Sequence, residues 1–218
     1  DWDYMEAFME QINQQAQARL NEYKEGKLEY TTLDTIGYTP VDTESWAEFK
    51  VGDLFDMVPG KRVRKHDQES GDILFVMASS ANQGIVSSIA NPITTVENGI
   101  TVDILGNCYY HPELVGYGDD NASLKLKNKY NKYETENVYL FLSTILHNIA
   151  KHASFTNKLR GSWYIEQTIK LPVKDASAAS VQEGPLDFAY AKSWRTPAEP
   201  DWDYMEAFME QINQQAQA

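Results

Sequence analysis

The sequence DWDYMEAFMEQINQQAQA fills residues 1–18, and the same letters return at residues 201–218. A repeat of this length without a single change is not a chance event, so the chain is organised around this element. Asp1 and Asp3 suit the cap and first turn of a helix, and Gly26 suits its end. We therefore expect a helix over residues 1–26 and a second copy of it over residues 200–218.

The apolar residues of this helix recur at positions three or four residues apart. Such spacing is typical of a coiled-coil seam rather than of a broad face packed on a core. A helix packed on its own domain is the alternative, but the duplication favours a helix that meets a second helix. The predicted seam residues are Met5, Met9, Ile12, Ala16 and Leu20 in the first copy and Tyr204, Met205, Phe208, Met209 and Ile212 in the second.

The segment between the two copies divides into a domain and two linkers. Residues 27–45 are polar and contain Gly37 and Pro40, and residues 176–199 are rich in Ala and Ser and then in Pro and Gly, so both are predicted to be linkers. Residues 46–175 hold short apolar and β-branched runs, such as 73–78 and 99–105, and one helical pattern at 137–150. The sequence predicts an α+β, strand-rich globular domain flanked by long helices that form coiled coils.

The charge of the chain is uneven. The net charge is −13, which by itself argues against a polyanionic partner. Residues 61–174, however, carry 13 Lys or Arg and 11 Asp or Glu, while both flanks are acidic. A polyanion is bound by local patches, so the central domain keeps nucleic acid open as a partner.

Other partners and compartments are constrained more directly. The sequence has no run of 18 apolar residues, so we expect no membrane span and no membrane partner. The single Cys108 cannot form a disulfide within the chain. Such cysteine usage suits a reducing compartment, and we expect a cytoplasmic protein.

The sequence shows no constellation of catalytic residues. The stretch Asn91-Pro92-Ile93-Thr94 lacks the second proline and the aromatic residue of the tetrad that amino-methyltransferases use. Asp119 and Asp120 have no spaced carboxylate partner, so a solvated turn explains them better than a metal site. The four histidines are scattered. We therefore expect a non-enzymatic chain with no metal and no cofactor of its own.

Several loops carry the residue types that contact DNA. A basic run follows a Pro-Gly turn, a loop of small polar residues follows a buried strand, and residues 154–160 mix polar and basic side chains. Arg and Lys donate to phosphate and to guanine, and Asn and Gln read adenine. Ordinary solvated turns explain each loop taken alone, but the set favours a DNA-facing side. The predicted DNA-binding residues are Lys61, Arg62, Arg64, Lys65, Ser79, Ser80, Asn82, Gln83, Lys158 and Arg160.

A further segment alternates lysines with tyrosines. Lys125, Lys127, Lys129 and Lys132 surround Tyr130 and Tyr133. This pattern suits a track along a nucleic-acid backbone, and it also suits a solvated ribbon. We count it with the basic loops as part of the expected DNA-facing side.

An ordered set of motifs resembles the DNA specificity subunits of type I restriction–modification systems. No single motif is decisive, but their order is fairly specific. The matching segments are 46–55 (WAEFKVGDLF), 59–62 (PGKR), 73–79 with 82–85 (ILFVMAS and NQGI), 169–173 (IKLPV) and 200–206 (PDWDYME). The departure is the stretch 176–199, which is longer than the short link that the family usually has there.

The resemblance implies a target recognition domain joined to conserved spacer helices. Such a subunit does no chemistry and reads one half of a split double-stranded DNA target. It presents an adenine to methyltransferase subunits, which flip it and use S-adenosylmethionine. The expected partners are therefore DNA, methyltransferase subunits and, in addition, a restriction subunit. S-adenosylmethionine and Mg²⁺ would belong to those partners.

Usual members of the family carry two such domains, and this chain carries one. It resembles a half-subunit that forms a homodimer through its helices, and an excerpt of a tandem pair is the other interpretation. Two further functions stay open. The first is an acidic antirestriction protein that mimics DNA, which the net charge favours and the basic loops oppose. The second is a hydrolase or nuclease.

Overall fold

The computed structural model describes residues 41, 43–160, 162–174 and 198–216. The predicted helix 1–26, with Met5, Met9, Ile12, Ala16 and Leu20, lies outside the described residues, as do most of the two predicted linkers. None of the helices in the described part is long and apolar enough to cross a membrane. The described residues from Thr43 onward belong to one compact unit.

The two ends of the central domain pair with each other. Strand β1 (Ala47–Lys50) runs antiparallel to β10 (Thr168–Leu171), with Ala47 opposite Leu171. The short helices α2 (Val51–Leu54) and α4 (Trp163–Glu166) follow β1 and precede β10, and the amide of Val51 donates to the carbonyl of Gln167 at 2.9 Å.

The central sheet has the strand order β2-β9-β6-β7 and is antiparallel throughout. Its strands are β2 (Phe55–Pro59), β6 (Gly99–Asp103), β7 (Cys108–His111) and β9 (Asn121–Leu126). Helix α3 (Glu136–Ala150) packs against this sheet, and its Leu142 and Leu146 are fully buried. The side chain of Thr135 caps the helix by accepting from the amide of Val138.

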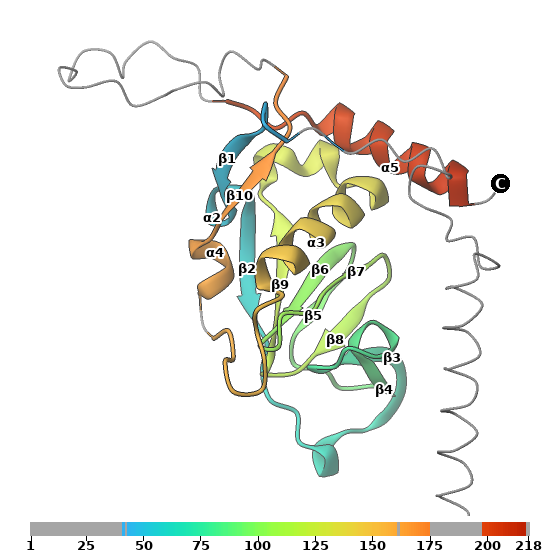
Figure 1. Ribbon diagram of the computed structural model, residues 1–218. Helices are drawn as coiled ribbons and strands as arrows, with labels where there is room; N and C mark the ends of the chain where they lie inside the picture. Colours follow the sequence, from blue (N-terminus) through green and yellow to red (C-terminus); the bar gives the residue numbers. More distant parts are fainter. Residues whose placement is uncertain (1–40, 42, 161, 175–197, 217–218) are drawn as a thin grey trace, which may run out of the picture. The chain divides into compact units, whose positions relative to one another are not determined.

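A second four-stranded sheet continues the domain, with the order β4-β3-β8-β5 (Figure 1). Strands β3 and β8 are parallel, and the other pairs are antiparallel. The Tyr117 hydroxyl joins the two sheets, because it donates to the carbonyl of Val58 and lies 2.9 Å from Ser123 Oγ. The strands are β3 (Ser70–Val76), β4 (Ile85–Ile89), β5 (Thr95–Val96) and β8 (Val115–Tyr117).

The second copy of the repeat forms helix α5 (Trp202–Ala216), which lies against α3. Trp202 is 2 % exposed, with its ring 5.0 Å from that of Tyr130 and 5.1 Å from that of Tyr133 in η3 (Asn128–Tyr133). The ring of Phe208 meets that of Phe141 edge-on. The carboxylate of Glu206 accepts from Thr135 Oγ1 and from Asn137 Nδ2, which fixes the start of α5 on the start of α3.

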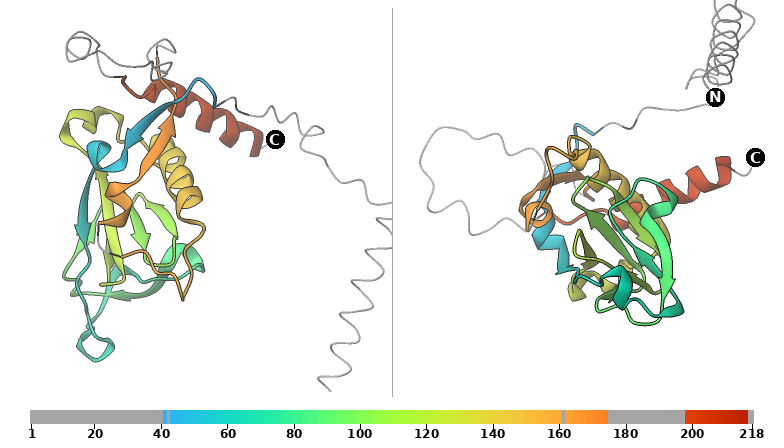
Figure 2. Two further views of the ribbon diagram at one scale, coloured as in Figure 1. Left: turned by 60° about the vertical axis from the view of Figure 1, so that its left-hand side comes forward. Right: turned by 90° about the horizontal axis from the view of Figure 1, so that it is seen from below.

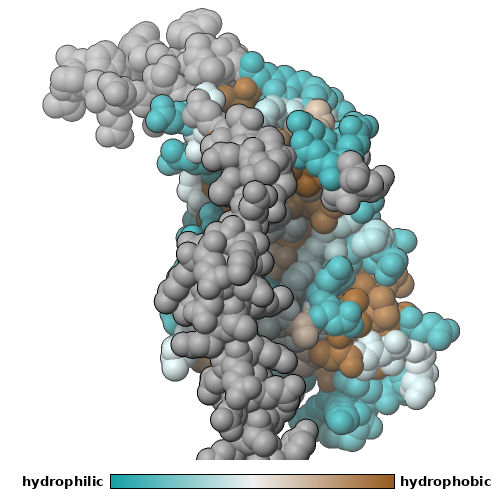
Figure 3. All heavy atoms as spheres, turned by 45° about the vertical axis from the view of Figure 1, so that its right-hand side comes forward, coloured by the Kyte–Doolittle hydropathy of each residue, from teal (hydrophilic) through white to brown (hydrophobic). Residues whose placement is uncertain are grey.

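Because α5 docks on its own domain, part of its predicted coiled-coil seam packs against the domain core. Met205 is fully buried in the core of its own domain, and Phe208 and Met209 pack against that core. Tyr204 and Ile212 are each 38 % exposed. Figure 3 shows the side of the molecule that lies to the right in Figure 1, with hydrophilic residues in the upper part of the described surface and hydrophobic residues beneath them. Met205 is therefore used inside its own domain, which the coiled-coil spacing alone did not indicate. A second helix could contact only the predicted seam residues that stay exposed, Tyr204 and Ile212.

Candidate nucleic-acid interface

Several connections of the two sheets meet at one end of the domain. The amide of Gly60, after β2, donates to the carbonyl of Asn121 at the start of β9, and the amide of Gly118, after β8, donates to the carbonyl of Val76 at the end of β3. Figures 1 and 2 show this end, with the segment after β2, lying opposite β1, β10 and α5. We call it the loop end. It consists of residues 60–69, 77–84, 104–107, 118–120 and 151–160.

A glycine lets the end of α3 approach the sheet. Gly106 has a φ of +89°, and a Cβ there would lie 2.4 Å from the carbonyl oxygen of Ala150. Only glycine meets both conditions without strain. The amide of Leu159 then donates to the carbonyl of Ile104 at 2.9 Å, and Leu159 is buried. These contacts bring the segment after α3 to the same end as the other connections.

The predicted basic run lies fully in solvent at the loop end. Lys61, Arg62, Arg64 and Lys65 are exposed, and none of them forms a salt bridge with a carboxylate among the described residues. The amide of Lys61 donates to Thr94 Oγ1 at 3.2 Å, which anchors the start of the run. Four cations with no carboxylate partner in the described part of the chain are available to phosphate groups.

A cavity of about 720 Å³ lies beside this run. Its lining includes Arg62, Arg64 and His66 as well as Asp119 and Asp120. A site that offers both donors and acceptors can hydrogen-bond the edges of bases as well as the backbone. Asp119 and Asp120, expected as a plain solvated turn, therefore belong to the loop end as well.

The loop after β3 separates its four predicted DNA-binding residues into two kinds. Ser79 Oγ accepts from the amide of Ala81, and Asn82 Nδ2 donates to the carbonyl of Ile85, so these two side chains shape the turn. Ser80 and Gln83 are exposed, and their side chains make no hydrogen bond within the described residues. Ser80 and Gln83 are the two that remain free for a ligand.

The backbone of this loop is strained. Asn82 and Gln83 have φ values of 49° and 51°, in the left-handed region that side chains other than glycine disfavour. Each such residue costs about 1 kcal/mol or more, and this kind of strain collects at functional sites. The Tyr109 hydroxyl donates to the carbonyl of Ser79 at 3.3 Å, and the amide of Met77 donates to the carbonyl of Gly84. The surrounding fold thus holds Gln83 in place.

The segment after α3 contributes the last predicted residues. Arg160 is exposed, and the Lys158 ammonium lies 4.4 Å from the centre of the Phe155 ring. Phe155 itself is 79 % exposed. Sequence reasoning missed Phe155, because an apolar residue in a polar stretch gives no indication of its exposure.

The Lys- and Tyr-rich segment does not lie at the loop end. The rings of Tyr130 and Tyr133 pack on Trp202, and the ammonium groups of Lys129 and Lys132 lie over those two rings. The structure therefore separates this segment from the basic loops, and its place on a DNA-facing side stays a prediction. The tyrosines are used to hold α5. We call η3, the start of α3 and α5 the helix end.

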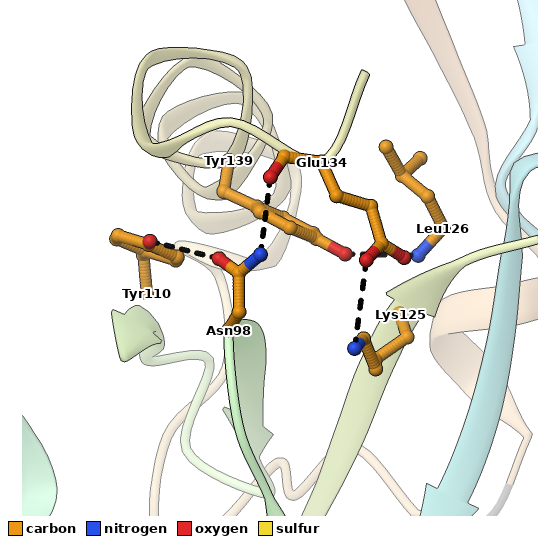
Figure 4. A network of polar contacts seen from close by, with 6 residues as sticks. All are labelled: Asn98, Tyr110, Lys125, Leu126, Glu134 and Tyr139. Carbon is orange, nitrogen blue, oxygen red and sulfur yellow. Dashed lines mark hydrogen bonds and ion pairs between the residues drawn. The ribbon is translucent and has the colours of Figure 1, made fainter. Parts of the chain in front are cut away.

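A polar network stabilises the approach to the helix end (Figure 4). Asn98 donates to the carbonyl of Glu134 at 3.0 Å and accepts from the Tyr110 hydroxyl at 2.9 Å. The Lys125 ammonium lies 3.5 Å from the Glu134 carboxylate. The Tyr139 hydroxyl accepts from the amide of Leu126, and burial raises the pKa of Tyr139. The groups of this network satisfy one another, unlike the cations of the loop end.

The buried titratable groups have structural partners. The Asp103 carboxylate accepts from the amides of Leu105 and Asn107 and from Asn107 Nδ2, which fixes the turn after β6. Burial raises the pKa of Cys108 to about 12, so its thiol stays protonated and unreactive. Burial lowers the pKa of His111 to about 4, and this ring lies 2.8 Å from Thr101 Oγ1. Within the described ranges, no three such side chains gather as metal ligands would.

The family model and the curated relative that match this chain point to one family. The family described as the type I restriction modification DNA specificity domain matches residues 43–184. The specificity subunit S.BcgI of a type II restriction enzyme from Heyndrickxia coagulans is 25 % identical over 214 residues. That match covers 96 % of this chain and 53 % of the relative, so the chain spans about half the length of the curated relative it matches.

Two solved structures share the fold. The HsdS subunit from Thermoanaerobacter tengcongensis superposes with a TM-score of 0.50 at 15 % identity, over 96 % of this chain and 49 % of that one. A chain from a structure described as showing complex assembly and conformational transition of the type I R-M system gives a TM-score of 0.53 at 14 % identity. It covers 96 % of this chain and 50 % of that one. At these identities the structures establish the arrangement of sheets and helices alone.

Proposed function

Because the chain belongs to the type I restriction modification DNA specificity family, we propose that its loop end reads one half of a bipartite double-stranded DNA target. The helix end, in this proposal, connects the domain to a second such domain and to methyltransferase and restriction subunits. The chain performs no chemistry itself. S-adenosylmethionine and Mg²⁺ act in the partner subunits, which would methylate an adenine in the bound DNA after flipping it.

One observation carries the proposal. All ten residues selected from the sequence as DNA-binding belong to three loops, and the hydrogen bonds of the strand ends bring these loops to one end of the domain. The four cations of the basic run have neither a carboxylate partner nor a ring contact among the described residues, whereas Lys129 and Lys132 of the helix end lie over tyrosine rings. The distribution suits an anionic ligand at the loop end.

The role of the helices follows from what α5 leaves exposed. Its first turns are fixed to the domain through Trp202, Met205 and Glu206. The remaining exposed residues include Ile212 and Tyr204. If these meet a helix of a second domain, the rigid attachment of α5 sets the distance between two reading domains, and thus the spacing between the two half-sites. A homodimer would then read an inverted repeat.

The test is selection of bound duplexes from a random-sequence pool by the full chain, followed by affinity measurements on the selected sequence. Replacing Arg62 and Arg64 by Ala should weaken binding by about 1–3 kcal/mol for each arginine that contacts a guanine. The matched control replaces Lys129 and Lys132 by Ala, which removes the same charge from the helix end and should leave the affinity nearly unchanged.

Two results would contradict the proposal. Equal losses for both pairs would mean that only the net charge matters. A chain that binds no duplex but binds a restriction–modification complex would support the acidic DNA mimic instead. Self-association is tested separately with Ile212→Glu, because deleting residues 201–218 would also remove Trp202 and Met205 from the core. Light scattering should show a halved mass, and an unaltered mass would exclude Ile212 from the dimer contact.

A further inference from the structure

The most exposed large apolar side chain among the described residues is Phe155, at 79 % exposed. It stands at the tip of the short turn between Ser154 and Asn157, in the segment that follows α3. Water disfavours an exposed aromatic ring, and a ring in this position could pack only against something outside the domain. Leu159, four residues later, is buried, so the segment does bury apolar groups where the fold allows it.

The turn that carries the ring is held firmly. The amide of Ser154 donates to the carbonyl of Asn157 at 3.1 Å, and the amide of Asn157 donates back to the carbonyl of Ser154 at 3.0 Å. Asn157 Nδ2 also donates to the carbonyl of His152. The amide of Leu159 attaches the segment to the sheet through the carbonyl of Ile104. Little conformational entropy is therefore lost when a ligand meets the ring.

One cation lies directly at the ring, and two more belong to the same segment. The Lys158 ammonium lies 4.4 Å from the ring centre, and Lys151 and Arg160 are exposed on the same segment. None of these three forms a salt bridge in the described part of the chain. An apolar ring flanked by cations is the combination that DNA-bending proteins use, where the ring enters between base pairs and the cations meet phosphates.

We propose that Phe155 is a wedge that enters a base step of the bound duplex and bends it, with Lys158 moving from the ring to a neighbouring phosphate. This inference rests on the proposed function and adds to it a DNA deformation beside the bases read by the other loops. The step that receives the ring should be a pyrimidine followed by a purine, because such steps unstack most easily.

The experiment measures bending and affinity together, with the full chain and a duplex of the selected sequence carrying a fluorophore at each end. Wild type should shorten the distance between the fluorophores. Phe155→Ala should abolish that change and weaken binding about tenfold, and Phe155→Leu, which keeps an apolar wedge, should retain most of both. Leu114→Ala is the matched control, because Leu114 is also exposed, at 42 %, but lies at the opposite ends of the strands.

The outcomes separate the wedge from the function on which it rests. Bending and affinity of wild-type size in Phe155→Ala would overturn the wedge and leave DNA reading intact. A wild-type chain that binds the duplex without bending it would overturn the wedge as well, because the ring would then only touch the surface. A wild-type chain that binds no duplex would remove the proposed function itself.

Discussion

Trp202, at the helix end, is 2 % exposed and has tyrosine rings 5.0 and 5.1 Å away, whereas Phe155, at the loop end, is 79 % exposed and has a lysine ammonium over its ring. Both are large aromatic residues with a fixed backbone, since Trp202 begins the 15-residue helix α5 and Phe155 stands in a hydrogen-bonded turn. The difference is that the helix end buries Trp202 and places its lysines over tyrosine rings, although Tyr204 and Ile212 of α5 stay exposed. The loop end fixes the backbone of Phe155 and Gln83 and leaves both side chains exposed. A surface of the second kind is prepared for a ligand.

The comparison predicts the largest effect for Trp202→Ala. Removing a buried indole from a packed aromatic cluster should lower the free energy of unfolding by about 3–5 kcal/mol, whereas Phe155→Ala should change it by about 0.5 kcal/mol or less. Urea unfolding followed by circular dichroism measures both. If the two variants were equally destabilised, the aromatic residues of the two ends would contribute equally to folding, against this prediction.

His111 gives the packed part of the domain a dependence on pH. Its folded pKa is about 4, below the ordinary value of 6.5, so between these values the unfolded chain binds a proton that the folded chain does not. Stability should therefore be complete above pH 6.5 and fall by about 3 kcal/mol as the pH drops toward 4. His111→Gln should flatten this dependence. His152→Gln, at an exposed position, should leave it as in wild type, and a flat wild-type profile would contradict the assignment.

Within the loop end, Gln83 can be compared with its neighbours Ser79 and Asn82. Its side chain is free while those of Ser79 and Asn82 shape the turn. Gln pairs with adenine and Glu accepts from cytosine, so Gln83→Glu should change the preferred base at one position, with a discrimination of about 1–3 kcal/mol. Sequencing of duplexes selected by each variant reads this out. Asn82→Asp is the comparison variant, and it should weaken binding without changing the selected base.

Much of this fold could be predicted from the sequence, because local patterns determine its pieces. The helical spacing at residues 137–150 corresponds to α3, and the run at 73–78 corresponds to β3. The docking of α5 could not be predicted in the same way. A spacing of four and three suits a second helix of any origin, and only the contacts of Trp202 with η3 and of Phe208 with Phe141 show that η3 and α3 supply the partner surface.

The sequence predicted which loops form the candidate site, but it did not predict which other segments and residues belong to it. The basic run and the polar loop were recognised because their residue types are those that meet DNA. The Lys- and Tyr-rich segment has the same types, yet its tyrosines hold Trp202, and only long-range packing distinguishes the two cases. Phe155 was omitted from the predicted site although it lies at the loop end. The tertiary fold decides whether an apolar residue is exposed, and the sequence alone does not indicate it.

Site-specific photo-crosslinking from the two ends of the full chain to a random-sequence duplex pool at low salt tests which end of the domain meets DNA. One variant carries a photoreactive residue in place of Arg64, at the loop end, and the other in place of Glu210, which is exposed on α5. We predict DNA crosslinks from position 64 and none from position 210. Crosslinks of equal yield from both positions, or from position 210 alone, would contradict the account.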